Sequence, residues 1–139
     1  MSEAIAIEAI VDRKRSDVWL LWTEPEHIRQ WNFASDDWCC PRAENDLRVS
    51  GRLCWRMEAK DGSFGFDFEG IYDEVLRDAK LAFTLTDGRR VETSFADMGD
   101  GTRVSTVFDP ESENSVEMQR LGWQAILDNF KKYAESTPI

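Results

Sequence analysis

The second half of the chain alternates between apolar and polar positions, which is the pattern of half-buried strands. Three Asp-Gly dipeptides, at Asp61-Gly62, Asp87-Gly88 and Asp100-Gly101, separate the alternating runs. Asp-Gly between such runs favours a β-hairpin, because the preferred two-residue turn needs positive φ at both central positions. The chain therefore predicts an antiparallel sheet that folds back and forth.

One face of the predicted strands collects most aromatic residues of this region. The positions between them are mostly polar, so a register slip of one residue would expose every ring. We therefore expect one buried face and one solvent-facing face. The expected buried positions are Leu53, Trp55, Met57, Phe64, Phe66, Phe68, Tyr72, Leu81, Phe83, Leu85, Val91, Thr93, Phe95, Val104, Thr106 and Phe108.

After the last strand the apolar residues recur every three or four positions, from about Ser115 to Ala134. This spacing predicts a long amphipathic helix, which would cover the apolar face of the sheet. Its expected inward positions are Gly122, Trp123, Ile126, Leu127, Phe130, Tyr133 and Ala134.

The first part of the chain predicts one strand, from Ala4 to Val11, and a short amphipathic helix, from Arg13 to Trp22. The segment Thr23-Glu24-Pro25-Glu26 matches a capping box, with the Thr23 side chain as the N-cap of a second short helix that ends near Trp31.

The stretch from Asn32 to Asn45 is rich in loop-forming residues, and we expect a short strand in it around Trp38. The order of strand, two helices, a run of strands and a helix indicates an α+β protein. We expect a single domain over residues 1–139.

The net charge of −10 narrows the classes of partner. So acidic a surface argues against nucleic acid and against anionic membranes. The sequence shows no leader peptide and no apolar segment long enough for a membrane span, so we expect a cytoplasmic protein. The three cysteines, Cys39, Cys40 and Cys54, form no disulfide framework, and an odd count with a vicinal pair predicts free thiols.

Candidate catalytic chemistry is sparse. His27 is the only histidine, and its place in the second short helix predicts a solvent-facing side chain. His27 and the cysteines also lack the spacing of a zinc site. A glycine-rich phosphate loop is absent from the sequence. We therefore predict no catalytic residue, no metal and no cofactor.

The predicted sheet is wider than its helical cover. One helix covers a strip about 10 Å wide, whereas six or so strands spaced at roughly 4.8 Å extend much further. If the sheet curls around the helix, the space between them is either filled by aromatic rings or left partly open. An open space would form an apolar pocket of about 300–1,000 Å³.

Several motifs resemble one known superfamily. They are Asp46-Leu47-Arg48-Val49-Ser50-Gly51-Arg52-Leu53, then Trp55-Arg56-Met57 and Gly70-Ile71-Tyr72, and the helical stretch from Gln119 to Phe130. They are similar to the SRPBCC superfamily of START-like, helix-grip proteins, in the branch of the activator of the heat-shock-protein-90 ATPase and the polyketide cyclase-like proteins. The resemblance implies a two-layer fold, in which a curved antiparallel sheet of six or seven strands wraps around a long C-terminal helix.

The resemblance implies a ligand site more clearly than a reaction. Members of this superfamily bind lipids, sterols, polyketides and plant hormones, and some are enzymes. We therefore expect a small protein that binds an apolar or aromatic molecule between the sheet and the last helix, with the Tyr72 hydroxyl as a polar group of the pocket. The expected ligand-binding residues are Trp38, Trp55, Met57, Phe66, Phe68, Tyr72, Phe83, Trp123 and Leu127.

Two other functions stay open. A cyclase or hydrolase would use the same cavity and would need a titratable group inside it. A module acting on a chaperone ATPase would use an exposed patch, although the eukaryotic activators carry a separate N-terminal domain for which 139 residues leave no room. A homodimer is compatible with each function.

Overall fold

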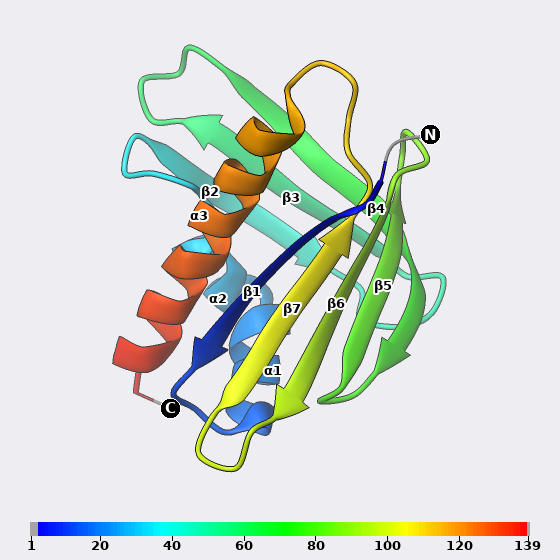
Figure 1. Cartoon of the computed structure of the whole chain (residues 1–139). Helices are drawn as coiled ribbons and strands as arrows, with labels where there is room; N and C mark the ends of the chain where they lie inside the picture. The colour runs from blue at the N-terminus through cyan, green and yellow to red at the C-terminus, as the bar shows by residue number, and fades with distance from the viewer. Residues whose placement is uncertain (1–2, 139) are drawn as a thin grey trace.

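A computed structural model, which describes residues 3–138, shows a seven-stranded antiparallel sheet curled around one long helix (Figure 1). The spatial order of the strands is β1-β7-β6-β5-β4-β3-β2, so only β1 and β7 are neighbours that do not follow one another in the chain. The predicted α+β helix-grip architecture is confirmed. The elements are β1 Ile5–Val11, α1 Arg15–Thr23, α2 Pro25–Trp31, β2 Trp38–Asn45, β3 Arg52–Ala59, β4 Gly65–Leu76, β5 Lys80–Leu85, β6 Arg90–Asp97, β7 Thr102–Phe108 and α3 Val116–Ser136.

All three helices lie on the concave side of the sheet (Figure 1). Helix α3 packs along β1 and α2 packs on β2, so the two edge strands are each held by a helix. The long helix begins where the sequence predicts, because the Ser115 side chain accepts a hydrogen bond from the Met118 backbone N–H at 3.1 Å.

The segregation of the sheet faces is confirmed for most of the predicted core. Trp55, Phe83, Phe95 and Phe108 are all buried on the concave side. Phe64 and Phe66 differ from the prediction, because their side chains are 61% and 42% exposed.

The two exposed rings belong to the hairpin between β3 and β4. They contact Trp38 of the neighbouring strand, with ring centroids 6.0 and 6.3 Å from it, and each other. The alternation gave the correct face for these residues, but it could not show that this hairpin lies where the helical cover is incomplete.

The three Asp-Gly hairpins form where predicted, but with a different turn geometry. Gly62 and Gly88 have positive φ, whereas the aspartates that precede them do not. The Gly88 N–H instead donates to the Leu85 carbonyl at 2.9 Å, which closes a four-residue turn from Leu85 to Gly88. The residue with positive φ is thus the glycine that follows the two central positions of the turn. In the third hairpin the positive φ falls on Gly99.

In the first part of the chain, one prediction is correct only in part and another is wrong. Strand β2 occupies eight residues, Trp38–Asn45, because pairing with β3 organises a segment whose sequence is typical of a loop. Thr23 is the last residue of α1, and its hydroxyl donates to the Trp19 carbonyl at 2.7 Å. It therefore cannot cap α2, whose N-cap is Glu24.

Candidate functional site

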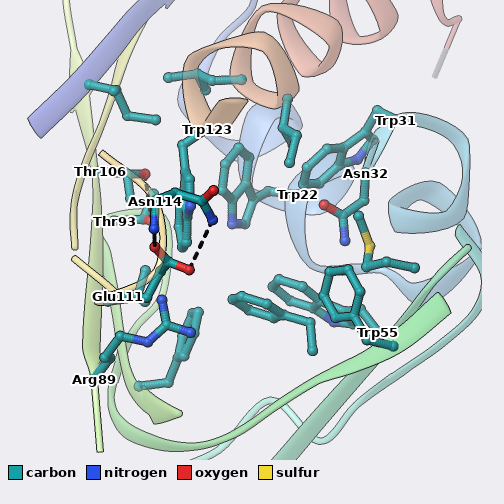
Figure 2. Close-up of a pocket in the computed structure, with 18 of the residues that line it drawn as sticks. Trp22, Trp31, Asn32, Trp55, Arg89, Thr93, Thr106, Glu111, Asn114 and Trp123 are labelled. Atoms are coloured by element: carbon teal, nitrogen blue, oxygen red, sulfur yellow. Dashed lines mark hydrogen bonds between the residues drawn. The ribbon is translucent and has the colours of Figure 1, made fainter. Parts of the chain in front are cut away.

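The concave side of the sheet and α3 form a partly open cavity of about 510 Å³ (Figure 2). This volume lies within the range of small-molecule sites, roughly 300–1,000 Å³. Eight of the wall residues are aromatic. The wall consists of Ile7, Trp22, Trp31, Asn32, Trp55, Met57, Phe64, Phe66, Phe68, Phe83, Arg89, Val91, Thr93, Thr106, Glu111, Glu113, Asn114, Trp123, Ile126 and Leu127.

Strands β3, β4 and β5 supply an aromatic wall. Trp55 and Phe68 are directly opposite one another in the β3–β4 register, and their rings stack with an interplanar angle of 8°. Phe83 of β5 meets both rings edge-on, with centroids 6.0 Å from Trp55 and 6.1 Å from Phe68. The ring order therefore follows from strand register, which fixes the shape of this wall.

Helix α3 supplies the opposite wall through Trp123, Ile126 and Leu127. The Trp123 ring stacks on Phe108 of β7, with 3.8 Å between centroids, and the edge contact between Trp123 and Phe68 spans 5.9 Å. The Trp123 indole thus bridges the two sides of the cavity. An aromatic ligand beside it would meet rings from both layers.

The short helices close one end of the cavity. Trp22 of α1 and Trp31 of α2 lie with 4.7 Å between their ring centroids, and each packs edge-on against Phe130 of α3. The Trp31 indole N–H donates to the Leu21 carbonyl at 3.0 Å, so its polar atom is satisfied within the protein.

Two polar groups of the wall have no partner. Among residues 3–138, the Asn32 side-chain amide nitrogen and the Trp55 indole nitrogen are buried and make no hydrogen bond. Asn32 is 5% exposed and Trp55 8% exposed. Buried N–H groups are nearly always hydrogen-bonded in folded proteins, so two such groups on one cavity wall call for an explanation.

The Cys40 thiol lies beside Asn32 and does not satisfy it. Burial raises the pKa of Cys40 to about 11, although the Asn32 amide lowers it in part. The thiol therefore stays protonated at neutral pH, and a neutral thiol is a weak acceptor. Its own proton points to the Arg42 carbonyl, with a sulfur–oxygen distance of 3.5 Å.

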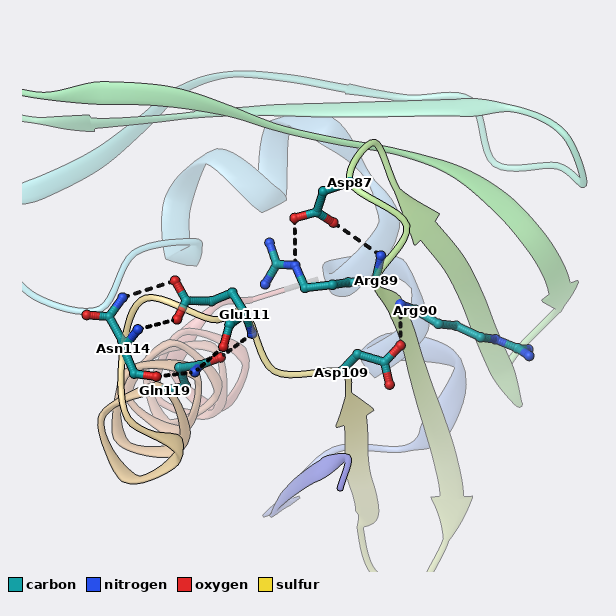
Figure 3. Close-up of polar contacts among 7 residues, drawn as sticks. All are labelled: Asp87, Arg89, Arg90, Asp109, Glu111, Asn114 and Gln119. Atoms are coloured by element: carbon teal, nitrogen blue, oxygen red, sulfur yellow. Dashed lines mark hydrogen bonds and ion pairs between the residues drawn. The ribbon is translucent and has the colours of Figure 1, made fainter. Parts of the chain in front are cut away.

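The other side of the cavity is formed by polar groups from the β5–β6 turn and the loop before α3 (Figures 2 and 3). The Arg89 Nε donates to an Asp87 carboxylate oxygen at 2.8 Å. The Glu111 carboxylate accepts from the Asn114 backbone N–H at 2.6 Å and from its side-chain amide at 3.1 Å.

Gln119 holds this loop onto α3. Its side-chain oxygen accepts from the Glu111 backbone N–H at 2.8 Å, and its amide donates to the Glu111 and Asn114 carbonyls at 3.1 and 2.8 Å (Figure 3). Gln119 is itself buried. A single side chain therefore fixes the loop that carries Glu111, Glu113 and Asn114 to the cavity.

The structure brings seven of the nine expected ligand-binding residues to the cavity wall. Trp38 lies outside the wall and packs on Phe64 and Phe66. Tyr72 also lies outside it. The seven residues of the wall are Trp55, Met57, Phe66, Phe68, Phe83, Trp123 and Leu127.

Tyr72 has a structural role. Its hydroxyl donates to the Asn45 side-chain oxygen at 2.5 Å, and the Asn45 amide donates to the Thr23 carbonyl at 2.8 Å. Burial raises the pKa of Tyr72 well above its usual range. The hydroxyl thus links β4 to the end of β2 and, through Asn45, to α1.

Sequence reasoning missed apolar wall residues, such as Trp22 and Trp31, and the polar residues Asn32, Arg89, Glu111, Glu113 and Asn114.

The polar ones share a feature. Each lies in or beside a connection rather than within an alternating strand. The available signal was position: Arg89 follows the Asp87-Gly88 turn, and the Glu111–Asn114 segment joins the last strand to the long helix.

The remaining candidate groups lie outside the cavity. His27 is half-buried rather than solvent-facing, and its Nδ1 is 2.6 Å from the Tyr133 hydroxyl, a contact between α2 and α3. Cys39, Cys40 and Cys54 are free thiols, as predicted. Cys54 lies beside Asp67 and Glu69, but these carboxylates already pair with Arg56 and Arg52.

The sequence profile of the family described as "Activator of Hsp90 ATPase homolog 1-like protein" matches residues 12–135, which is most of the chain. The chain belongs to this family. A comparison with curated proteins gave no significant match.

Solved structures agree with this membership. The solution structure of the AHSA1-like protein from Aeromonas hydrophila is 44% identical, with a TM-score of 0.90, and the match covers 96% of this chain and 92% of that one. A protein from Cytophaga hutchinsonii is 45% identical, with a TM-score of 0.83 and coverage of 95% and 92%. A protein from Chromobacterium violaceum, 20% identical with a TM-score of 0.85 and coverage of 96% and 99%, shows the shared fold alone.

Membership of the Hsp90-ATPase-activator-homologue family establishes the fold, but one fold can serve many functions. The function of this member has to be argued from its cavity. Between residues 3 and 138, no helix has the length and apolar character that crossing a membrane requires.

Proposed function

We propose that this protein binds a small apolar or aromatic molecule in the cavity between the sheet and α3. The observation that carries the proposal is a partly open cavity of about 510 Å³ with eight aromatic wall residues. Burial of an aromatic ligand against such a wall is favourable, since it removes apolar surface from water and allows ring contacts.

A fluorescence titration with N-phenyl-1-naphthylamine, a neutral apolar dye, tests this proposal. The variant Ile126→Trp places an indole in the wall and should weaken dye binding by about tenfold or more, because a 1.4 kcal/mol loss already has this effect. Leu121→Trp is the matched control, because Leu121 lies on the same helix and is 62% exposed. It should leave the affinity within about twofold.

If both variants bind the dye with the affinity of the wild type, the dye binds outside the cavity. The titration would then contradict the proposal that the cavity is the binding site. Native mass spectrometry of freshly purified protein adds a second readout, because a co-purifying small molecule would name its chemical class directly.

The alternative of a cyclase or hydrolase has one observation in its favour. Glu111 and Glu113 bring carboxylates to the cavity wall, which sequence reasoning did not anticipate. Both Glu111 oxygens, however, accept hydrogen bonds from Asn114. This arrangement supports a role for Glu111 in holding the loop more than a role in proton transfer, which needs a carboxylate within reach of the ligand.

The description of the family refers to an activator of the Hsp90 ATPase. Stimulation of a chaperone ATPase would require contact through an outer surface of this protein. The turnover of a purified Hsp90-type ATPase, measured with and without this protein, separates the two functions. If the protein only binds a small molecule, the turnover rate of the ATPase stays unchanged. Stimulation of the ATPase that persists in the Ile126→Trp variant would favour a protein-interaction function.

A further inference from the structure

The two unpartnered N–H groups of the cavity wall belong to separate elements. Asn32 follows the last residue of α2, and Trp55 lies in the middle of β3. Figure 2 shows both on one side of the cavity, across from Arg89, Thr93, Thr106 and Glu111. That side of the wall therefore offers donors without matching acceptors.

The opposite side is largely self-satisfied. The hydroxyls of Thr93 and Thr106 hydrogen-bond to one another at 2.8 Å, and Glu111 accepts from Asn114. Among the buried side-chain polar atoms of residues 3–138, those without a hydrogen-bond partner are the Asn32 and Trp55 donors.

Both N–H groups are already shielded from water and have no acceptor within the protein. An entirely apolar ligand would leave both N–H groups buried without a partner, which is costly, whereas an acceptor atom on the ligand avoids this cost. A wall with unmet donors thus selects for a ligand with an acceptor.

The charges of the wall decide whether that acceptor is ionised. The wall holds one cation, Arg89, and two acids, Glu111 and Glu113, and the Arg89 Nε already pairs with the Asp87 carboxylate. The net charge of the whole chain is −10. A carboxylate or phosphate ligand would meet net repulsion here, whereas a neutral acceptor would not.

We infer that the ligand is an uncharged aromatic molecule with a hydrogen-bond acceptor such as a carbonyl oxygen, and that Asn32 and Trp55 recognise this acceptor. The inference rests on the proposed function. It makes the two residues determinants of specificity, in a cavity whose other contacts are mostly apolar.

A pair of dyes separates the acceptor from the aromatic body. One is 6-propionyl-2-(dimethylamino)naphthalene, a neutral naphthyl ketone, and the other is N-phenyl-1-naphthylamine, which has no carbonyl. Trp55→Phe keeps an aromatic ring and removes the N–H, and Asn32→Leu removes the amide at similar size. Each should weaken ketone binding by about fivefold and amine binding by less than about twofold.

Trp31→Phe is the matched control, because Trp31 also belongs to the wall but its N–H is bound to the Leu21 carbonyl. It should change the affinities for the two dyes by the same factor. If Trp55→Phe and Asn32→Leu also weaken both dyes equally, or if the wild type binds only the amine, the acceptor inference is wrong. Binding of neither dye by the wild type would overturn the proposed function as well.

A measurement on the wild-type protein avoids any effect of the variants on folding. In ¹⁵N–¹H spectra the Trp55 indole signal should move downfield when the ketone saturates the protein and should not do so with the amine. The Trp31 indole signal serves as the internal reference. A Trp55 signal that responds identically to both dyes would contradict the inference.

Discussion

The indole of Trp55 lies parallel to the ring of Phe68, with 5.3 Å between the centroids and 8° between the planes. The two residues are register partners on β3 and β4, so the stack is set by strand pairing. Phe83 and Trp123 then meet Phe68 edge-on at 6.1 and 5.9 Å. Phe68 is therefore the ring through which the sheet wall and the helix wall of the cavity make contact.

Phe68→Ala should weaken the binding of N-phenyl-1-naphthylamine by about tenfold, because it removes a ring that makes three aromatic contacts in the wall. A fluorescence titration measures the affinity. Phe95→Leu is the control, because Phe95 is buried outside the cavity wall and packs on Trp19 and Trp22. Unchanged binding of every hydrophobic dye by the Phe68 variant would argue against its place in the site.

Gln119→Leu should lower the free energy of unfolding by about 2 kcal/mol, because it leaves the Glu111 N–H and two loop carbonyls without their partner. Urea unfolding measures the loss, and amide hydrogen exchange should become faster at Glu111. Gln30→Leu tests the same substitution at an exposed site of α2 and should change stability by less than about 0.5 kcal/mol. Equal effects of the two variants would show that Gln119 does not fix the loop.

Gly122→Ala should raise the free energy of unfolding by about 0.5–1 kcal/mol. Gly122 lies within α3, and an added Cβ would meet no atom within 4 Å. Gly70→Ala is the opposite case, because its Cβ would lie 2.8 Å from the Thr84 backbone oxygen across the β4–β5 pair. Thermal or urea unfolding should therefore give shifts of opposite sign, and destabilisation by the Gly122 change would refute the open space beside it.

The stability of the fold should fall in alkali partly because of Cys40. Burial raises the pKa of its thiol from 9.0 to about 11, so the folded state holds the proton more tightly than the unfolded state. This contribution is complete below pH 9 and is lost as the pH rises to about 11, at a cost of about 1–3 kcal/mol.

Urea unfolding across this pH range compares the wild type with Cys40→Ala. The wild type should lose more stability than the variant, since Cys54 and Tyr72, whose pKa values are also raised, are present in both proteins. Parallel curves for the two proteins would show that the Cys40 thiol does not contribute.

The sheet was predictable because its signals are local. Alternation from Leu53 to Met57 gave the buried face, and the Asp-Gly dipeptides gave the positions of three hairpins. Strand β2 was missed in part, because its sequence lacks alternation and its conformation depends on pairing with β3. Sequence pattern thus predicts strands whose own residues alternate, but it does not predict a strand whose conformation depends on pairing with a distant segment.

The polar part of the candidate site depends on such distant partners. The alternation places Tyr72 on the inward face, but its hydroxyl donates a hydrogen bond to Asn45, 27 positions earlier in the chain, and does not line the cavity. Asn32 and Trp55 come together on one wall although nothing in either segment predicts the other. Glu111 reaches the cavity only because Gln119 folds the loop back onto α3.

The most direct test of ligand binding in the cavity is the observation of nuclear Overhauser effects between N-phenyl-1-naphthylamine and assigned methyl groups. The account predicts contacts from the ring protons of the dye to Ile126 and Leu127, which belong to the cavity wall. Contacts instead to Ile71 and Val107, which are 45% and 44% exposed on the outer face of the sheet, would contradict it.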